Sequence, residues 1–284
     1  MRSLLRELGG TSLLCSLLLT GCGIGSRQAS ENPVKFESIS VEKIYHLLDD
    51  PNNPNCNLEI QFTYPSTYTA NEEILHSLQT QFISSYFGEN YEQLSPKEAV
   101  KEYTEDYLAS YKELEEDFRT EIEHGDDSPV SAWFSYYEMS SNEIIYNRGG
   151  IISYTVSFEN YTGGAHGAHS HNHHVLDLNT GLPIMEEDIF NDNYQDALAQ
   201  ILVDKIAQEN NLTEVKELEN IGFFSVDEIF PNGNFLVDET GITYSFNEYE
   251  IAAYVVGITN IHLPYKEIRY LLKDESPIAN IIGN

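Results

Sequence analysis

Five of the nine histidines lie within nine consecutive residues, and they are the side chains best suited to metal chemistry: His166, His169, His171, His173 and His174. In an extended strand, His169, His171 and His173 would project from one face, roughly 6–7 Å apart. Neutral imidazoles grouped in this way bind zinc, copper or nickel, and nearby carboxylates can complete the ligand set. The alternative is an exposed polar loop that binds divalent metal only adventitiously. We favour this alternative and expect no physiological cofactor.

Other catalytic chemistry leaves no recognisable pattern. The sequence has no glycine-rich phosphate loop, no G-x-S-x-G elbow, no H-E-x-x-H and no C-x-x-C. With 46 acidic residues, pairs of carboxylates occur by chance, so spacing alone identifies no glycosidase-like acid and base. We therefore expect a protein that is not an enzyme.

The charge of the chain limits its partners. Only 15 basic residues accompany the 46 acidic ones in 284, which gives a formal net charge of −31. Nucleic-acid binding needs clustered Lys and Arg to neutralise phosphates, and attraction to anionic lipid headgroups needs the same charges. Both are excluded. An acidic surface steers basic partners towards it, although it also keeps a protein soluble.

The first residues read as an export signal. Arg2 and Arg6 precede a mostly apolar stretch over 11–20, which is too short to span a bilayer of about 30 Å. The stretch ends in Leu-Thr-Gly-Cys22, which resembles the lipobox of bacterial lipoproteins. Residues 1–21 are then a signal peptide and Cys22 carries the lipid. We expect a lipid anchor in the bacterial cell envelope, at the outer membrane because no obvious retention signal follows Cys22.

The residues after Cys22 are small and polar, and we expect 22–41 to be a flexible tether. Cys15 lies in the signal peptide, so Cys56 is the single thiol left once Cys22 is lipidated. No intramolecular disulfide is possible then. No basic residue neighbours Cys56 in the sequence, and we expect it to be an inert, small residue.

Periodicity in the first half predicts a strand, two helices and three more strands. Alternation over 58–64 predicts a strand stopped by Pro65. Asn71 is placed to cap one helix, and Ser95-Pro96-Lys97-Glu98 forms a capping box for a longer one ending at Gly125. Strands are expected over 133–139, 143–146 and 151–158.

The second half repeats this mixture with shorter elements. We expect a strand over 175–178, a tight turn at Asn179-Thr180-Gly181, and a helix around 198–206 capped by Asp192 or Asn193. Short strands follow over 235–237, 242–246 and 261–263, and then a last helix over 265–272. The fold class is α+β, with two small domains, 42–165 and 166–284, each an antiparallel sheet packed by one or two helices.

Two strings carry a family resemblance. One is Tyr161-Thr-Gly163-Gly164-Ala-His166-Gly, and the other is Tyr249-Glu250-Ile-Ala followed by Gly257 and Leu-Pro-Tyr265. With the turn region around 177–190, they resemble the paired extracytoplasmic domains of RsiV-type anti-sigma factors and PdaC-type peptidoglycan deacetylases. The resemblance runs from about residue 57 to 272. It implies a tight backbone at the two glycines and a structural hydrogen bond from His166.

The resemblance suggests binding more than catalysis. The RsiV-type ectodomain binds lysozyme, and the PdaC-type copy precedes a separate catalytic domain. We therefore expect a stand-alone, lipid-anchored copy, RsiV-like in its second domain. Its acidic head would bind a basic protein of the lysozyme kind or a cell-wall glycan. The alternative is a metal-dependent hydrolase that acts on peptidoglycan through the His-rich segment.

Two loops are the candidate contact surfaces. The first contributes Tyr161, Gly163, Gly164 and His166, and the second contributes Tyr249, Glu250 and Tyr254. Loops with glycines and aromatic side chains on a rigid scaffold commonly present binding surfaces. The same residues could equally lock the two halves together by packing.

Overall fold

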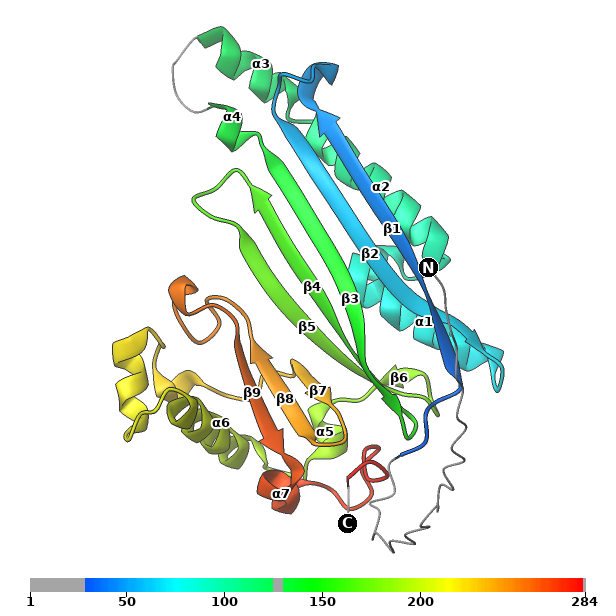
Figure 1. The fold of residues 1–284 in the computed structure, drawn as a ribbon, viewed down its shortest axis with the longest axis vertical. Helices are drawn as coiled ribbons and strands as arrows, with labels where there is room; N and C mark the ends of the chain where they lie inside the picture. Colours follow the sequence, from blue (N-terminus) through cyan, green and yellow to red (C-terminus); the bar gives the residue numbers. More distant parts are fainter. Residues whose placement is uncertain (1–28, 125–129, 283–284) are drawn as a thin grey trace, which may run out of the picture.

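The computed structural model describes residues 29–124 and 130–282 (Figure 1). The expected signal peptide, Cys22 and the first part of the expected tether lie outside these ranges. Within them, no helix has the length and apolar character needed to cross a membrane. The chain forms two α+β units, as the periodicity predicts, with a six-stranded sheet in the first and a three-stranded sheet in the second.

The large sheet has its strands side by side in chain order, β1 to β6. Neighbouring strands are antiparallel except β2 and β3, which are parallel because helices cross over between them. The strands are β1 (Val34–His46), β2 (Asn55–Tyr68), β3 (Tyr136–Arg148), β4 (Ile151–Thr162), β5 (Ala168–Asp177) and β6 (Leu182–Pro183).

Helices from the crossover lie along one face of this sheet (Figure 1). Asn71 caps α1 (Glu72–Phe87) by accepting from the amides of Glu73 and Ile74. The capping box at Ser95 starts α2 (Pro96–Lys112), as expected. The expected single helix to Gly125 is wrong, however, because α2 ends at Lys112 and a separate α3 (Glu115–His124) follows. A short α4 (Val130–Trp133) leads into β3.

Three expectations about strands need correction. The two strands expected over 133–139 and 143–146 are one strand, β3, with a bulge near Ile144, and residue 133 belongs to α4. Pro65 does not end β2, because a bulge against Lys35 and Phe36 accommodates it. The tether is also shorter than expected. Residues from Val34 pair along β2, and Asn32 bonds the carbonyl of Ile151 (2.8 Å), so this segment belongs to the folded head.

The second unit packs a short sheet against one long helix. The expected strands are confirmed within a residue or two: β7 (Phe235–Val237), β8 (Gly241–Phe246) and β9 (Thr259–Pro264). Its helices are α5 (Glu186–Ile189), α6 (Gln195–Glu209) and α7 (Tyr265–Ile268). The cap expected for α6 is wrong, because Tyr194 precedes this helix and makes no side-chain cap.

The boundary expected between residues 165 and 166 falls inside the large sheet. Strand β5 pairs with β4 from Ala168 to Asp177, so the His-rich segment belongs to the first unit. The lower ends of β3, β4 and β5 also contribute Tyr146, Ile151 and Val175 to the apolar core of the second unit. The two units therefore share strands and do not separate at a linker.

The large sheet is covered differently on its two faces. Helices α1 and α2 bury one face over its length, in a core that includes Phe62, Phe82 and Tyr154. The second unit covers only the lower part of the other face, where Ser153 donates to the carbonyl of Val237 (2.7 Å). Cys56 is fully buried near α2 and α3, and burial raises the pKa of its thiol to about 11, as expected of an inert thiol.

Candidate functional site

The exposed polar loop that we favoured for the His-rich segment is wrong, because the segment is the fifth strand of the large sheet and His173 is buried. Its side chains alternate as they would in an extended strand. His169, His171 and His173 face away from α1 and α2, whereas the ring of His174 stacks on Tyr154 on the helix side, with 5.0 Å between ring centroids. The alternation therefore divides the cluster between two environments.

His173 connects the two sheets. Its Nδ1 bonds the hydroxyl of Thr155 on β4 (2.9 Å), and its Nε2 makes a short bond to the hydroxyl of Ser245 on β8. Burial lowers the pKa of His173 to about 4, with the neighbouring His171 and His174 adding to the effect. The imidazole is thus neutral at pH 7 and has both nitrogens occupied.

His169 is held between two carboxylates. Its Nδ1 bonds Glu248 of the second unit at 3.0 Å, and its Nε2 lies 3.6 Å from Glu159 on β4. The three-histidine metal site is therefore wrong, because His173 and His169 are committed to contacts inside the protein. In the part of the chain that the structure describes, no group of three or more His, Cys, Asp or Glu side chains is arranged to hold a metal ion.

Side chains of the second unit also form hydrogen bonds with the backbone of β5. The amide of His171 donates to Asn247 (2.8 Å), and its carbonyl accepts from Asn234 (2.8 Å). Asn234 also accepts from the amide of His173 (2.7 Å). These side chains occupy strand-edge groups that would otherwise pair with another strand. Sequence reasoning missed them, because only the polar run Asn232-Gly233-Asn234 marks the place.

The two candidate loops meet in space although they are far apart in the sequence. We call Tyr161, His166, Tyr249 and Tyr254 the aromatic junction. The ring of His166 stacks on Tyr254 with centroids 3.9 Å apart, and its Nε2 lies 3.2 Å from the hydroxyl of Tyr249. Its Nδ1 bonds the carbonyl of Gly167, so the structural hydrogen bond expected of His166 is confirmed.

The other residues of the two candidate strings hold the loops in shape. Gly163 has φ +79°, and a Cβ there would lie 2.1 Å from the carbonyl oxygen of Trp133. The tight backbone is thus confirmed at Gly163 but not at Gly164, where a Cβ would make only an ordinary contact, 3.8 Å from the carbonyl oxygen of His166. Tyr161 donates to the carbonyl of Gly164 (2.8 Å). Glu250 accepts from Asn232 (2.6 Å) and closes its own turn, so it supports the loop.

Tyr249 has an unusual backbone. Its φ is +64°, a left-handed conformation that costs a bulky residue roughly 1–2 kcal/mol. The side chain is nevertheless 56% exposed, so burial does not compensate for this cost. Desolvation raises the pKa of the neighbouring Tyr254 phenol, with the carboxylate of Glu248 and the Tyr249 ring adding to it. The turn therefore presents aromatic rings beside negative charge.

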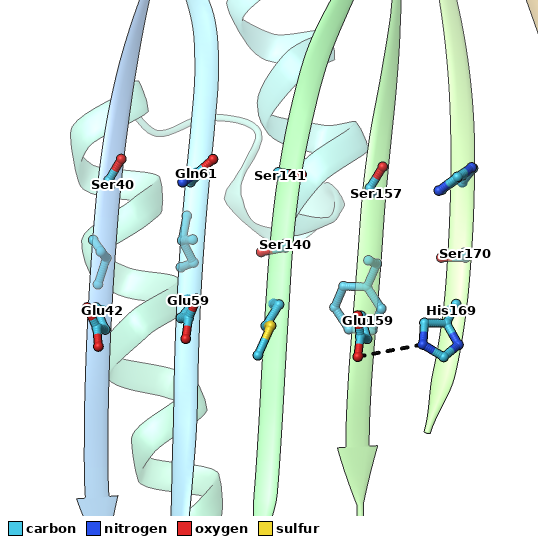
Figure 2. Close-up of a pocket in the computed structure, with 15 residues that line it drawn as sticks. Ser40, Glu42, Glu59, Gln61, Ser140, Ser141, Ser157, Glu159, His169 and Ser170 are labelled. Atoms are coloured by element: carbon cyan, nitrogen blue, oxygen red, sulfur yellow. Dashed lines mark ion pairs between the residues drawn. The ribbon is translucent and has the colours of Figure 1, made fainter. Parts of the chain in front are cut away.

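Above the second unit, the uncovered part of the large sheet forms an open face (Figure 2). The pairing of the strands arranges its side chains in two rows that run from β1 to β5. One row contains Glu42, Glu59, Met139, Glu159 and His169, and the other contains Ser40, Gln61, Ser141, Ser157 and His171. They line a cavity of about 520 Å³.

The open face is acidic, and no Lys or Arg of the described residues neutralises its carboxylates; Glu59 accepts from Asn57 (2.9 Å) and Glu159 from Tyr137 (3.0 Å). Glu42 and Glu59 lie directly opposite each other on β1 and β2. In the described residues, no Lys or Arg pairs with either of them or with Glu159. Figure 2 shows the side chains of both rows standing in front of the strands, with the helices behind. Carboxylates without a Lys or Arg partner are available to a basic ligand.

Comparisons with known proteins agree with this architecture. A model of the PdaC deacetylase family matches residues 52–169, and a model described as a protein of unknown function, DUF3298, matches residues 187–266. A crystal structure of a DUF3298 member from Bacteroides fragilis is 33% identical to this chain, with a TM-score of 0.82. It covers 88% of this chain and 98% of its own.

The chain belongs to the DUF3298 family. A second structure, a DUF3298 protein from Pseudomonas aeruginosa, shares the fold at 15% identity, with a TM-score of 0.60 over 89% of this chain and 99% of its own. No curated protein matches the chain. PdaC is the name of the family model, and the match assigns no activity to this chain.

The two family matches locate the candidate surfaces of this DUF3298 protein. The PdaC-like match includes β2 to β4, which form most of the open face, and also His166. The DUF3298 match includes Tyr249 and Tyr254. The aromatic junction is thus one of the places where the two matched regions touch, next to the open face that the first one carries.

Proposed function

We propose that this DUF3298 protein is a non-catalytic binding module of the bacterial cell envelope that takes a basic protein on its open face. The observation that carries the proposal is the row of Glu42, Glu59 and Glu159, which have no Lys or Arg partner in the described residues. Carboxylates that no Lys or Arg neutralises on an uncovered face complement the charge of a basic ligand. The net charge of −31 favours fast, salt-sensitive association.

The same face supports binding more than catalysis. An activated nucleophile needs its base within hydrogen-bond reach. Ser157 and His171 are opposite each other on β4 and β5, but their side chains make no hydrogen bond to each other. The lysozyme type of ligand comes from the resemblance to RsiV-type ectodomains, and a cell-wall glycan is the second ligand class that this resemblance allows.

The test is a calorimetric titration of the full chain, in mild nonionic detergent, with lysozyme at low and moderate salt. We expect saturable binding that weakens as salt rises. The double variant Glu42→Gln/Glu59→Gln should weaken binding roughly threefold to tenfold at low salt. The matched control is Glu102→Gln/Glu113→Gln, which removes two exposed carboxylates from α2 and its C-terminal end.

Each result has a definite reading. No binding at either salt rejects the basic-protein ligand, and cell-wall glycan fragments then become the ligand to titrate. Equal weakening in the two double variants shows that overall charge, and not the open face, attracts lysozyme.

Envelope attachment is a separate part of the proposal. The Leu-Thr-Gly-Cys22 string supports a lipid on Cys22, and we place the anchor at the outer membrane. The variant Cys22→Ser should move the protein from the membrane fraction to the soluble fraction. Retention of Cys22→Ser in the membrane fraction would reject the lipid anchor while leaving the binding test untouched.

A further inference from the structure

The aromatic junction is left unexplained by a purely electrostatic open face. Tyr249 is 56% exposed, and the nearby Val255 is 88% exposed. Tyr249 also adopts the left-handed backbone conformation that Gly or Asn would occupy without strain. A strained turn that presents an exposed ring points to a role for the ring itself.

The chemistry around the rings favours a cation. The carboxylates of Glu159 and Glu248 lie on either side of His169, close to the junction. Both contribute negative charge at Tyr254. The faces of tyrosine rings carry the negative part of the aromatic quadrupole, so they attract positive groups. Rings beside carboxylates therefore complement a positively charged group.

Geometry connects the junction to the open face. Tyr137 stacks on Tyr161 with centroids 6.2 Å apart, and its hydroxyl donates to Glu159 at 3.0 Å. Glu159 belongs to the acidic row of the open face. One ligand can therefore touch both places without a change in the protein.

We propose that the aromatic junction holds an arginine side chain of the basic ligand. The planar guanidinium stacks on the exposed ring of Tyr249, and the negative charges of Glu159 and Glu248 nearby attract it. A lysine ammonium is a compact, strongly hydrated charge and stacks less well. The inference rests on the proposed function and adds a division of roles: the open face speeds association, and the junction slows dissociation and selects arginine over lysine.

The experiment compares two probes of equal charge, octa-arginine and octa-lysine, binding to the full chain at one salt concentration. Wild-type protein should bind octa-arginine at least tenfold more tightly. The variant Tyr249→Asn removes the ring and suits the left-handed backbone, so we expect an unchanged melting temperature and loss of the preference. Tyr249→Phe keeps the ring and should keep the preference. Tyr270→Asn, which alters another exposed tyrosine, is the matched control.

The outcomes separate the two proposals. Suppose that both peptides bind with equal affinity, that this affinity falls in Glu42→Gln/Glu59→Gln and that it is unchanged in Tyr249→Asn. The arginine site is then wrong, and the proposal for the open face stands. If neither peptide binds, the proposed function fails and the arginine site with it. A large drop in melting temperature for Tyr249→Asn would show that the ring serves packing between the units. Loss of the preference in Tyr249→Phe would assign recognition to the hydroxyl and contradict stacking.

Discussion

The two faces of the large sheet are built from the same strands but obey different constraints. On β4, Tyr154 points to the helices and is 1% exposed, whereas Ser157 and Glu159 point the other way and remain partly exposed. The covered face is defined by shape, since each ring there touches several others. The open face is defined by which polar groups stand side by side. Packing therefore determines the residues of one face and leaves those of the other free to serve binding.

The largest expected effect comes from removing a buried side chain from the covered face. Phe82 is fully buried and stacks on Tyr154 with centroids 3.9 Å apart. Phe82→Ala should lower the free energy of unfolding by about 3–5 kcal/mol, through lost burial and the cavity left behind. Urea unfolding at neutral pH measures it. The partner variant is Ser141→Ala on the open face, which should change stability by less than about 0.5 kcal/mol. Similar losses in the two variants would contradict the difference between the faces.

A second effect comes from acid. Burial lowers the pKa of both His173 and His174 to about 4, whereas the unfolded chain protonates histidine near 6.5. The unfolded state thus binds more protons below pH 6.5, so stability is fully present above 6.5 and is lost as the pH falls towards 4. Each histidine should contribute a loss on the order of 2–3 kcal/mol. Urea unfolding at several pH values between 7 and 4 measures this slope.

One substitution separates the two histidines. The Nε2 of His174 is buried without a hydrogen-bond partner, and its ring stacks on Tyr154. His174→Phe keeps a ring there and removes the titrating group, so roughly half of the acid loss should disappear while stability at pH 7 is kept or improved. The matched control is His76→Ala, which removes a histidine from an exposed site on α1. An unchanged profile for His174→Phe would assign the acid sensitivity elsewhere.

Sequence reasoning recovered what depends on local order. The capping box at Ser95 and the alternation of His169, His171 and His173 are both present in the structure. It failed where strands with one solvated face carry weak apolar signals, which is why the expected tether extended to residue 41 and included most of β1. It also could not foresee pairs brought together only by the fold. Residues His166 and Tyr249 are 83 positions apart, and each string alone is compatible with either packing or binding.

The residues that make up the open face could not be predicted from the sequence for a related reason. Its rows exist only because β2 lies parallel to β3 in one particular register, which places Glu59 beside Met139. A shift of one residue would turn every side chain of a strand to the other face. The spacing of Glu42, Glu59 and Glu159 along the chain does not predict that they share a row.

The smallest expected effect is a change in stability. It is the sharpest test of the difference between the covered face and the open face. Like charges directly opposite each other destabilise a sheet, and Glu42 faces Glu59 across β1 and β2. Glu42→Gln/Glu59→Gln should therefore raise the free energy of unfolding by a few tenths of a kcal/mol at low salt, and the gain should shrink in high salt as screening removes the repulsion. Urea unfolding at two salt concentrations measures it, with Glu102→Gln/Glu113→Gln as the control for overall charge.

The meaning of that gain depends on binding. If the double variant is more stable and binds a basic ligand less well, the repulsion in the wild-type protein serves ligand binding. Binding sites often reduce stability in this way. A double variant that gains stability and binds as before would show that the two carboxylates repel each other without serving the open face. The site would then have to be sought at the aromatic junction alone, where the strain at Tyr249 is the remaining local conflict between fold and function.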